Sequence, residues 1–186
     1  MMTSGSRRET LAAVAGRNYR LDVYLVRHAF AAHADPARWP DDAVRPLTEE
    51  GTTRFRAAAR GLQRLVPAVD SVLSSGYARA WQTAQLLHDV AGWREPNECP
   101  ALEAGRPASS ALDVLQARAE RSIALVGHEP YLSRLASLLC TGSEDGLQLE
   151  LKKGAVASLS FTGPVEPARA CLRWTVSPKI LRRLDR

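Results

Sequence analysis

The chain has 186 residues, 45% of them hydrophobic, so its length and apolar content fit one compact domain with a sizeable core. Its formal net charge of +5 arises from 22 arginines and 3 lysines set against 20 acidic residues. No dense basic run with interleaved aromatic residues occurs, which argues against a nucleic-acid partner. The arginine excess favours anionic ligands, although a codon-composition bias would produce the same excess.

The N-terminal segment is expected to be separate from the folded part. Residues 1–19 are predicted to form a poorly ordered tail, and residues 20–186 to form a single domain. The apolar stretch at residues 11–15 is shorter than the roughly 7–15 residues of a signal peptide's apolar region. No run approaches the roughly 20 apolar residues of a membrane span, so no membrane partner is expected.

The first half of the folded part begins with a short β-rich strand at residues 21–26 and an irregular, proline-containing segment at residues 29–47. Thr48 is the predicted N-cap of a helix that ends at about Val66. Its buried face is predicted to comprise Phe55, Ala58, Ala59, Leu62 and Leu65. A second strand at residues 69–74 and a helix at residues 78–90 follow.

The second half continues the alternation after a connection at residues 93–106, for which no regular element is predicted. The predicted elements are then a helix at 108–119, a strand at 122–126, a helix at 130–140, and two alternating strands at 156–161 and 171–176. Strand–helix alternation over residues 21–140 indicates parallel βαβ units, and the final strand pair indicates an antiparallel addition. The predicted fold class is therefore α/β, a three-layer α/β/α arrangement with a largely parallel central sheet and an antiparallel edge.

Two histidines follow directly on predicted strands. Arg27-His28 comes after the strand at 21–26, and Gly127-His128 after the strand at 122–126. Ligands of parallel sheets collect at the carboxyl ends of the strands, so both histidines are expected to face one cleft. Arg79, in the first turn of the helix that follows the second strand, can address an anion at the same place.

These four side chains suit a tetrahedral phosphoryl group. Arginine neutralises phosphoryl oxygens bidentately, and a neutral imidazole is a competent nucleophile near neutral pH. No phosphate-binding glycine loop and no metal-binding carboxylate cluster occurs in the sequence, so neither a metal nor another cofactor is expected. The scattered Cys99, Cys140 and Cys171 form no CxxC pair, which indicates a reducing, cytoplasmic compartment and no zinc site.

The motifs at these positions resemble those of the histidine phosphatase superfamily, which includes the phosphoglycerate mutases. Leu25-Val26-Arg27-His28-Ala29 is similar to its RHG signature, residues 74–84 to its SSxxxRAxQTA motif, and Val126-Gly127-His128-Glu129 to the segment with its second histidine. The short length and the segments 45–51 and 177–178 look most like the SixA-type phosphohistidine phosphatases. The resemblance spans about residues 21–181 and implies a phosphoglycerate mutase-like fold.

The resemblance also implies roles for the site residues. His28 would be the nucleophile that carries the phosphoryl group, and Arg27, Arg79 and His128 would hold the phosphoryl oxygens. Glu103 is a candidate for the acid that protonates the leaving group, with Glu129 and Asp35 as alternatives. The Ser/Thr and Asn that follow the signature in mutase-like members are absent, which argues against a sugar-phosphate mutase.

The function expected from this pattern is a metal-independent phosphatase that acts through a phosphohistidine intermediate on His28. Its phosphorylated substrate could be a phosphohistidine-containing signalling protein. Two alternatives remain open from the sequence: a small-molecule phosphomonoesterase of the same superfamily, and a catalytically inactive phosphate-binding module.

Overall fold

The computed structural model describes residues 20–185, and the tail predicted at residues 1–19 lies outside them. Six strands form one sheet in the order β3-β2-β4-β1-β5-β6. Strands β3, β2, β4 and β1 run parallel, and β5 pairs antiparallel with both β1 and β6. The predicted largely parallel sheet with an antiparallel addition is therefore confirmed.

The elements alternate along the chain much as their periodicity indicated. The strands are β1 (Leu21–Arg27), β2 (Ser71–Ser74), β3 (Pro96–Glu98), β4 (Ser122–Gly127), β5 (Val156–Phe161) and β6 (Cys171–Val176). The α-helices are α2 (Glu49–Leu65), α3 (Ala78–Ala91), α4 (Ser109–Gln116), α5 (Tyr131–Thr141) and α6 (Pro178–Leu184). Two short 3₁₀ helices, η1 (Asp42–Val44) and η2 (Pro100–Leu102), interrupt the connections.

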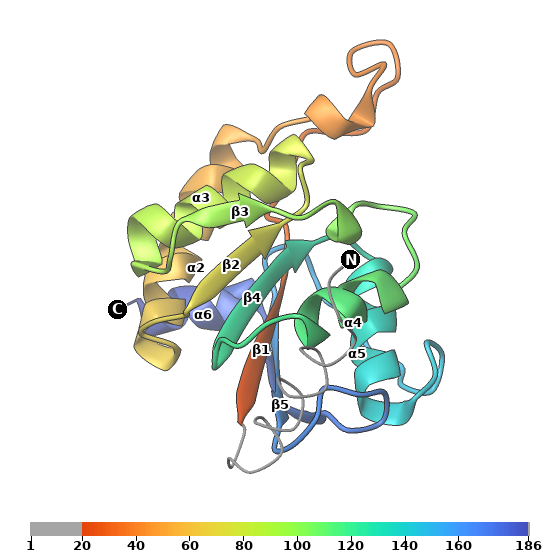
Figure 1. Ribbon diagram of the computed structural model, residues 1–186. Helices are drawn as coiled ribbons and strands as arrows, with labels where there is room; N and C mark the ends of the chain where they lie inside the picture. The colour runs from red at the N-terminus through yellow and green to blue at the C-terminus, as the bar shows by residue number, and fades with distance from the viewer. Residues whose placement is uncertain (1–19, 186) are drawn as a thin grey trace, which may run out of the picture.

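Helices cover both faces of the sheet, as Figure 1 shows. Helices α2, α3 and α6 lie on one face, where Val26, Val72 and Val126 of the strands pack in the same apolar cluster as the helices. Helices α4 and α5 lie on the other face and enclose a second cluster around Leu25 and Leu125. Because the central strands are buried on both faces, they read as continuous apolar runs. The three-layer α/β/α prediction is confirmed.

Three local expectations differ from the structure. Leu65, predicted to be buried, is exposed because α2 ends there. The 93–106 connection contains β3, whose three residues are too few to show a period and are ordered by pairing with β2. The prediction also missed α6, although the Ser177 N-cap and the following Pro178 are helix-start signals.

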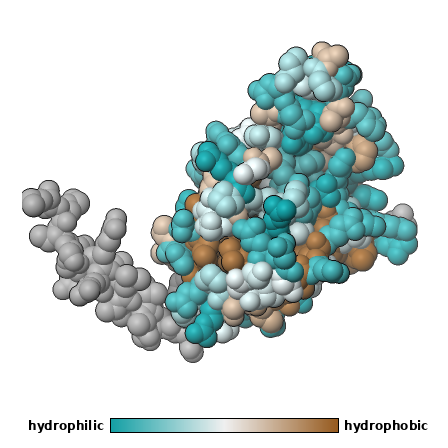
Figure 2. Space-filling view, turned by 90° about the vertical axis from the view of Figure 1, so that its right-hand side faces the viewer, coloured by the Kyte–Doolittle hydropathy of each residue, from teal (hydrophilic) through white to brown (hydrophobic). Residues whose placement is uncertain are grey.

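The segment between β1 and α2 forms a projection that we call the lobe, residues 32–46. An isolated bridge between Ala31 and Leu47 closes its base. In Figure 1 the lobe stands beyond the carboxyl ends of the parallel strands, at the edge where ligands of such sheets bind. Elsewhere, Figure 2 shows a face on which hydrophilic residues predominate and apolar residues form separate patches. Among residues 20–185, no helix combines the length and apolarity needed to cross a bilayer.

Candidate active site

The two strand-end histidines meet at the carboxyl edge of the sheet. Arg27 and Gly127 are partners in the parallel pairing of β1 with β4, so the next residues, His28 and His128, emerge side by side. The backbone N–H of His28 donates to the carbonyl of Gly127 (3.0 Å), and the ring centroids of the two histidines are 5.2 Å apart. Strand pairing thus brings together two histidines that lie a hundred residues apart in the sequence.

The tautomer of His28 follows from its hydrogen bond. Its Nδ1 lies 2.7 Å from the carbonyl oxygen of Ala29, and because that oxygen can only accept, Nδ1 carries the proton. The lone pair is therefore on Nε2. Burial lowers the pKa of His28 to about 3, and the charges of Arg79, Arg27 and Lys153 act in the same direction. The imidazole is accordingly neutral and nucleophilic at physiological pH.

His128 is buried beside it in a similar state. Burial lowers its pKa to about 3, and the proximity of His28 and Arg79 adds to this shift. Its Nε2 lies 3.0 Å from the hydroxyl oxygen of Ser75, at the carboxyl end of β2. Its Nδ1 is buried without a hydrogen-bond partner among residues 20–185. A buried unpartnered nitrogen is costly unless a ligand completes it.

Two arginines complete the cluster predicted from the sequence. Arg27 Nη1 donates to the carbonyl of Leu151 (2.6 Å), and Arg79 Nη1 donates to the carbonyl of Asp42 (2.8 Å). In the described part of the chain, the Nε of each arginine is buried and has no hydrogen-bond partner. The structure therefore brings together all four predicted residues, with three unpartnered polar atoms among them. This arrangement can receive a tetrahedral anion next to His28.

The motif helix α3 is tied to the segment that carries His28. The Thr83 hydroxyl donates to the carbonyl of Arg79 (2.7 Å) and accepts from the backbone N–H of Ala29 (3.0 Å). Gln82 Oε1 accepts from the backbone N–H of Leu47 at the base of the lobe (2.8 Å). Helix α2 also approaches this segment closely at Gly51, where a Cβ would clash with the carbonyl of Phe30, so this position needs glycine. These contacts fix His28 and Arg79 relative to each other.

Asp42 is a site residue that the sequence did not reveal. It lies in the lobe, its carboxylate contacts Arg79 Nη2 (2.9 Å), and its other oxygen accepts from Arg45 Nε (2.7 Å). The hydrogen bond from Arg45, assisted by Arg79, holds the pKa of Asp42 below its usual value. Nothing in the irregular segment indicated which of its carboxylates would face the strand ends. Asp42 is therefore a positioning residue for the Arg79 guanidinium.

Asp42→Ala is expected to raise KM for a phosphate ester by about fivefold. The Asp42 side chain is 50% exposed, so its ion pair with Arg79 should contribute on the order of 1 kcal/mol. The remaining backbone contact holds Arg79 less firmly, and kcat should change less than KM. Steady-state kinetics on Asp42→Ala and Asp42→Glu test this, since the glutamate should restore part of the affinity. An unchanged KM in the alanine variant would contradict the positioning role.

The lowered pKa values of the two histidines predict a loss of stability in acid. Below the ordinary value of 6.5 the unfolded chain binds protons that the folded chain, with pKa values of about 3, excludes. The free energy of unfolding should therefore fall as the pH decreases through this window, by up to roughly 2–3 kcal/mol per histidine at about pH 4.5. Urea unfolding of the wild type and of His128→Gln at about pH 7 and about pH 4.5 measures this. Equal pH dependence in both proteins would refute it.

The three candidate acids lie in different surroundings. Glu103 follows η2 and is half-buried, whereas Glu129 Oε1 accepts from the Ser133 hydroxyl (2.7 Å) at the start of α5. Asp35 is exposed in the lobe and accepts from the backbone N–H of Ala37. The role of Glu103 as the leaving-group acid stays a prediction. Within residues 20–185, no group of three or more His, Cys, Asp or Glu side chains is arranged to hold a metal ion.

Comparisons with known proteins identify the family of the chain. Residues 23–104 match the family described as the histidine phosphatase superfamily (branch 1). The chain is 34% identical over 143 residues to an uncharacterized protein of Picosynechococcus, covering 75% of this chain and 84% of that protein. It is 28% identical over 163 residues to the phosphohistidine phosphatase SixA of Escherichia coli, covering 85% and 94%.

The fold comparison points the same way. A solved structure of the protein histidine phosphatase SixA complexed with tungstate superposes with a TM-score of 0.75 at 26% identity, covering 87% of this chain and 99% of that one. The match thus covers nearly the whole of that structure.

Proposed function

The chain belongs to the histidine phosphatase superfamily, and from this we propose that it is a hydrolase in which His28 carries the phosphoryl group as a covalent intermediate. The observation that carries the proposal is the state of His28. Its Nδ1 proton is held by the Ala29 carbonyl, which leaves the Nε2 lone pair available beside the unpartnered nitrogens of Arg27, Arg79 and His128.

In the first step, Nε2 of His28 attacks phosphorus in line with the leaving group. A bond between Nε2 and phosphorus forms while the bond from phosphorus to the leaving group breaks, and the leaving group takes up a proton from water or from an acid, for which Glu103 is the candidate. Arg27 and Arg79 stabilise the charge on the equatorial oxygens, the main requirement in phosphoryl transfer. As negative charge approaches, the pKa of His128 rises, so His128 can donate a hydrogen bond to a phosphoryl oxygen.

In the second step, water attacks the phosphorus of phospho-His28. The bond between Nε2 and phosphorus breaks, orthophosphate leaves, and neutral His28 is regenerated. The Ala29 carbonyl keeps Nδ1 protonated in both steps and supports the positive charge on the ring of the intermediate. The same contacts of Arg27 and Arg79 serve the second transition state, because the phosphoryl group stays in place.

We propose phosphohistidine in a protein as the substrate. Support comes from the SixA relatives, whose names describe phosphohistidine phosphatases and which match along most of this chain. An imidazole leaves more readily than an alkoxide, so the reaction depends less on a strong acid such as Glu103. We further propose a cytoplasmic, signalling role, which is consistent with three free cysteines at Cys99, Cys140 and Cys171.

A substrate panel in the presence of EDTA tests the function. We expect metal-independent hydrolysis of a phosphohistidine peptide and of an aryl phosphate, inhibition by tungstate, and a phosphoenzyme that survives quenching in base and is lost in acid. The lability in acid distinguishes phosphohistidine from a phosphoserine ester. Loss of turnover on chelation, or an acid-stable phosphoenzyme, would defeat the proposal.

A further inference from the structure

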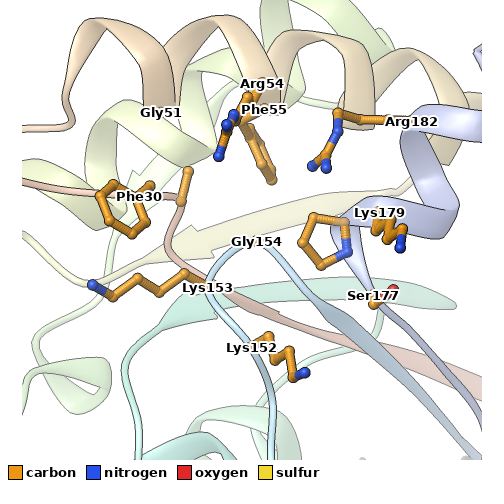
Figure 3. Close-up of a pocket in the computed structure, with 12 residues that line it drawn as sticks. Phe30, Gly51, Arg54, Phe55, Lys152, Lys153, Gly154, Ser177, Lys179 and Arg182 are labelled. Atoms are coloured by element: carbon orange, nitrogen blue, oxygen red, sulfur yellow. The ribbon is translucent and has the colours of Figure 1, made fainter.

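A cavity of about 320 Å³ opens beside the active site, between α2, α6 and the loop that precedes β5. We call it the basic pocket, because five of its lining side chains are cationic: Arg54, Lys152, Lys153, Lys179 and Arg182. They include all three lysines of the chain. Figure 3 shows the guanidinium groups of Arg54 and Arg182 directed from the two helices toward the space near Gly154.

The basic pocket is continuous with the segment that carries His28. Ala29 and Phe30, the two residues after His28, form part of its wall. Gly154 lies on the opposite wall, and its backbone N–H is shared between the carbonyls of Arg27 (3.1 Å) and His28 (3.0 Å). A group bound in the pocket therefore lies close to a phosphoryl group held at His28.

Most of these cations lack a carboxylate partner within the described residues. Arg54 pairs with Glu50 on the exposed side of α2, and no ion pair involves the other four among residues 20–185. Burial lowers the pKa of Lys153, and the charges of Arg27, Arg45 and Arg79 act in the same direction, so the positive charge of the pocket adjoins that of the active site. Such a concentration is unfavourable in the isolated chain and favourable toward an anionic partner.

The character of the rim favours a protein surface over a small anion. Phe30 is 44% exposed, and Lys153 Nζ lies 4.5 Å from its ring centroid, as the close-up in Figure 3 illustrates. An exposed aromatic ring among arginines is typical of protein interfaces. The cations also come from three separate elements, so they are spread more widely than the oxygens of one phosphate group.

We propose that the basic pocket binds acidic side chains of the phosphorylated protein, next to its phosphohistidine. This inference rests on the proposed function and specifies the substrate: a phosphohistidine with glutamate or aspartate nearby. The pocket contributes to substrate binding and not to the chemical step, because its cations contact the partner protein and not the transferred phosphoryl group. Its contribution should appear in KM and weaken at high ionic strength.

Two synthetic phosphohistidine peptides of equal length test this, one with glutamates and one with glutamines beside the phosphohistidine. We expect the wild type to prefer the glutamate peptide by about tenfold in kcat/KM at low salt. Arg182→Glu and Lys179→Glu should abolish this preference. The matched control is Arg183→Glu, an exposed neighbour on α6 that does not line the pocket and should keep it. Thermal unfolding checks that the variants are folded.

The outcomes separate this inference from the proposed function. Equal turnover of both peptides by the wild type would overturn the inference and leave the phosphatase function intact. Failure to hydrolyse either peptide or an aryl phosphate would reject the function itself. Binding of a labelled, unphosphorylated glutamate peptide then still tests the pocket. If pyrophosphate binds in an Arg182-dependent way and the glutamate peptide does not, the pocket serves a small anion and the proposal is wrong.

Discussion

His28→Ala is expected to lower kcat by a factor on the order of 10⁴ or more and to abolish the phosphoenzyme. The substitution removes Nε2, the atom that forms the bond to phosphorus. The arginines cannot replace it, because they are protonated, and His128 is oriented by the contact of its Nε2 with the Ser75 hydroxyl toward the phosphoryl oxygens. Rapid quenching in base with a radiolabelled aryl phosphate measures both effects.

His33→Ala is the control for this experiment, since His33 is exposed in the lobe and should be dispensable for turnover. His28→Ala should still bind tungstate, because Arg27 and Arg79 remain. Retained anion binding would show that the loss is chemical and not a collapse of the site. A phosphoenzyme in the alanine variant would mean that another residue is the nucleophile.

Arg79→Ala is the second substitution with a large expected effect, a fall in kcat/KM of about 10² to 10³. The Arg79 guanidinium is buried, and Asp42 orients it from the lobe. Its loss removes a positive charge where negative charge develops in the transition state. It also leaves the Asp42 carboxylate facing the site with less compensation, which repels the substrate.

Arg79→Lys separates charge from geometry. Lysine keeps the positive charge but lacks the planar fork that donates to two phosphoryl oxygens and to the Asp42 carboxylate. We expect Arg79→Lys to restore less than about a tenth of the lost kcat/KM, because a point charge cannot make the bidentate contacts. Arg121→Ala, an exposed arginine at the opposite end of β4, should behave as the wild type. Full rescue by lysine would show that charge alone matters.

The lobe contributes residues to the site that the local sequence pattern does not predict. Residues 29–47 read as irregular because of their prolines, and no period places any side chain. The structure nevertheless uses Asp42 and Arg45 from this segment to hold Arg79. Those contacts depend on the bridge between Ala31 and Leu47 and on Gln82 of α3, which are long-range interactions. No local sequence pattern specifies such contacts.

The short elements β3 and α6 also depend on long-range contacts. Strand β3 exists because its backbone pairs with β2, and α6 is anchored to α2 by a bidentate contact between Arg60 and Asp185 (2.8 and 2.9 Å). Neither has enough residues for its own periodicity to specify it. Helix α6 forms one wall of the basic pocket. Because local sequence pattern does not predict α6, it does not predict the pocket either.

The sequence by itself determined the α/β class, the order of the main strands and helices, the strand-end residues Arg27, His28 and His128, and Arg79 in the first turn of the helix after β2. The periodicity of apolar residues and the position of a residue at the end of a strand are local properties, so neighbouring residues in the sequence specify them. The tertiary structure alone decided which nitrogen of His28 is free, which carboxylate orients Arg79, and that the lysines gather beside the site. The first depends on the backbone conformation that sets the Ala29 carbonyl against the neighbouring His28 ring. The other two arise from contacts between segments distant in the sequence, which form only once the sheet has formed.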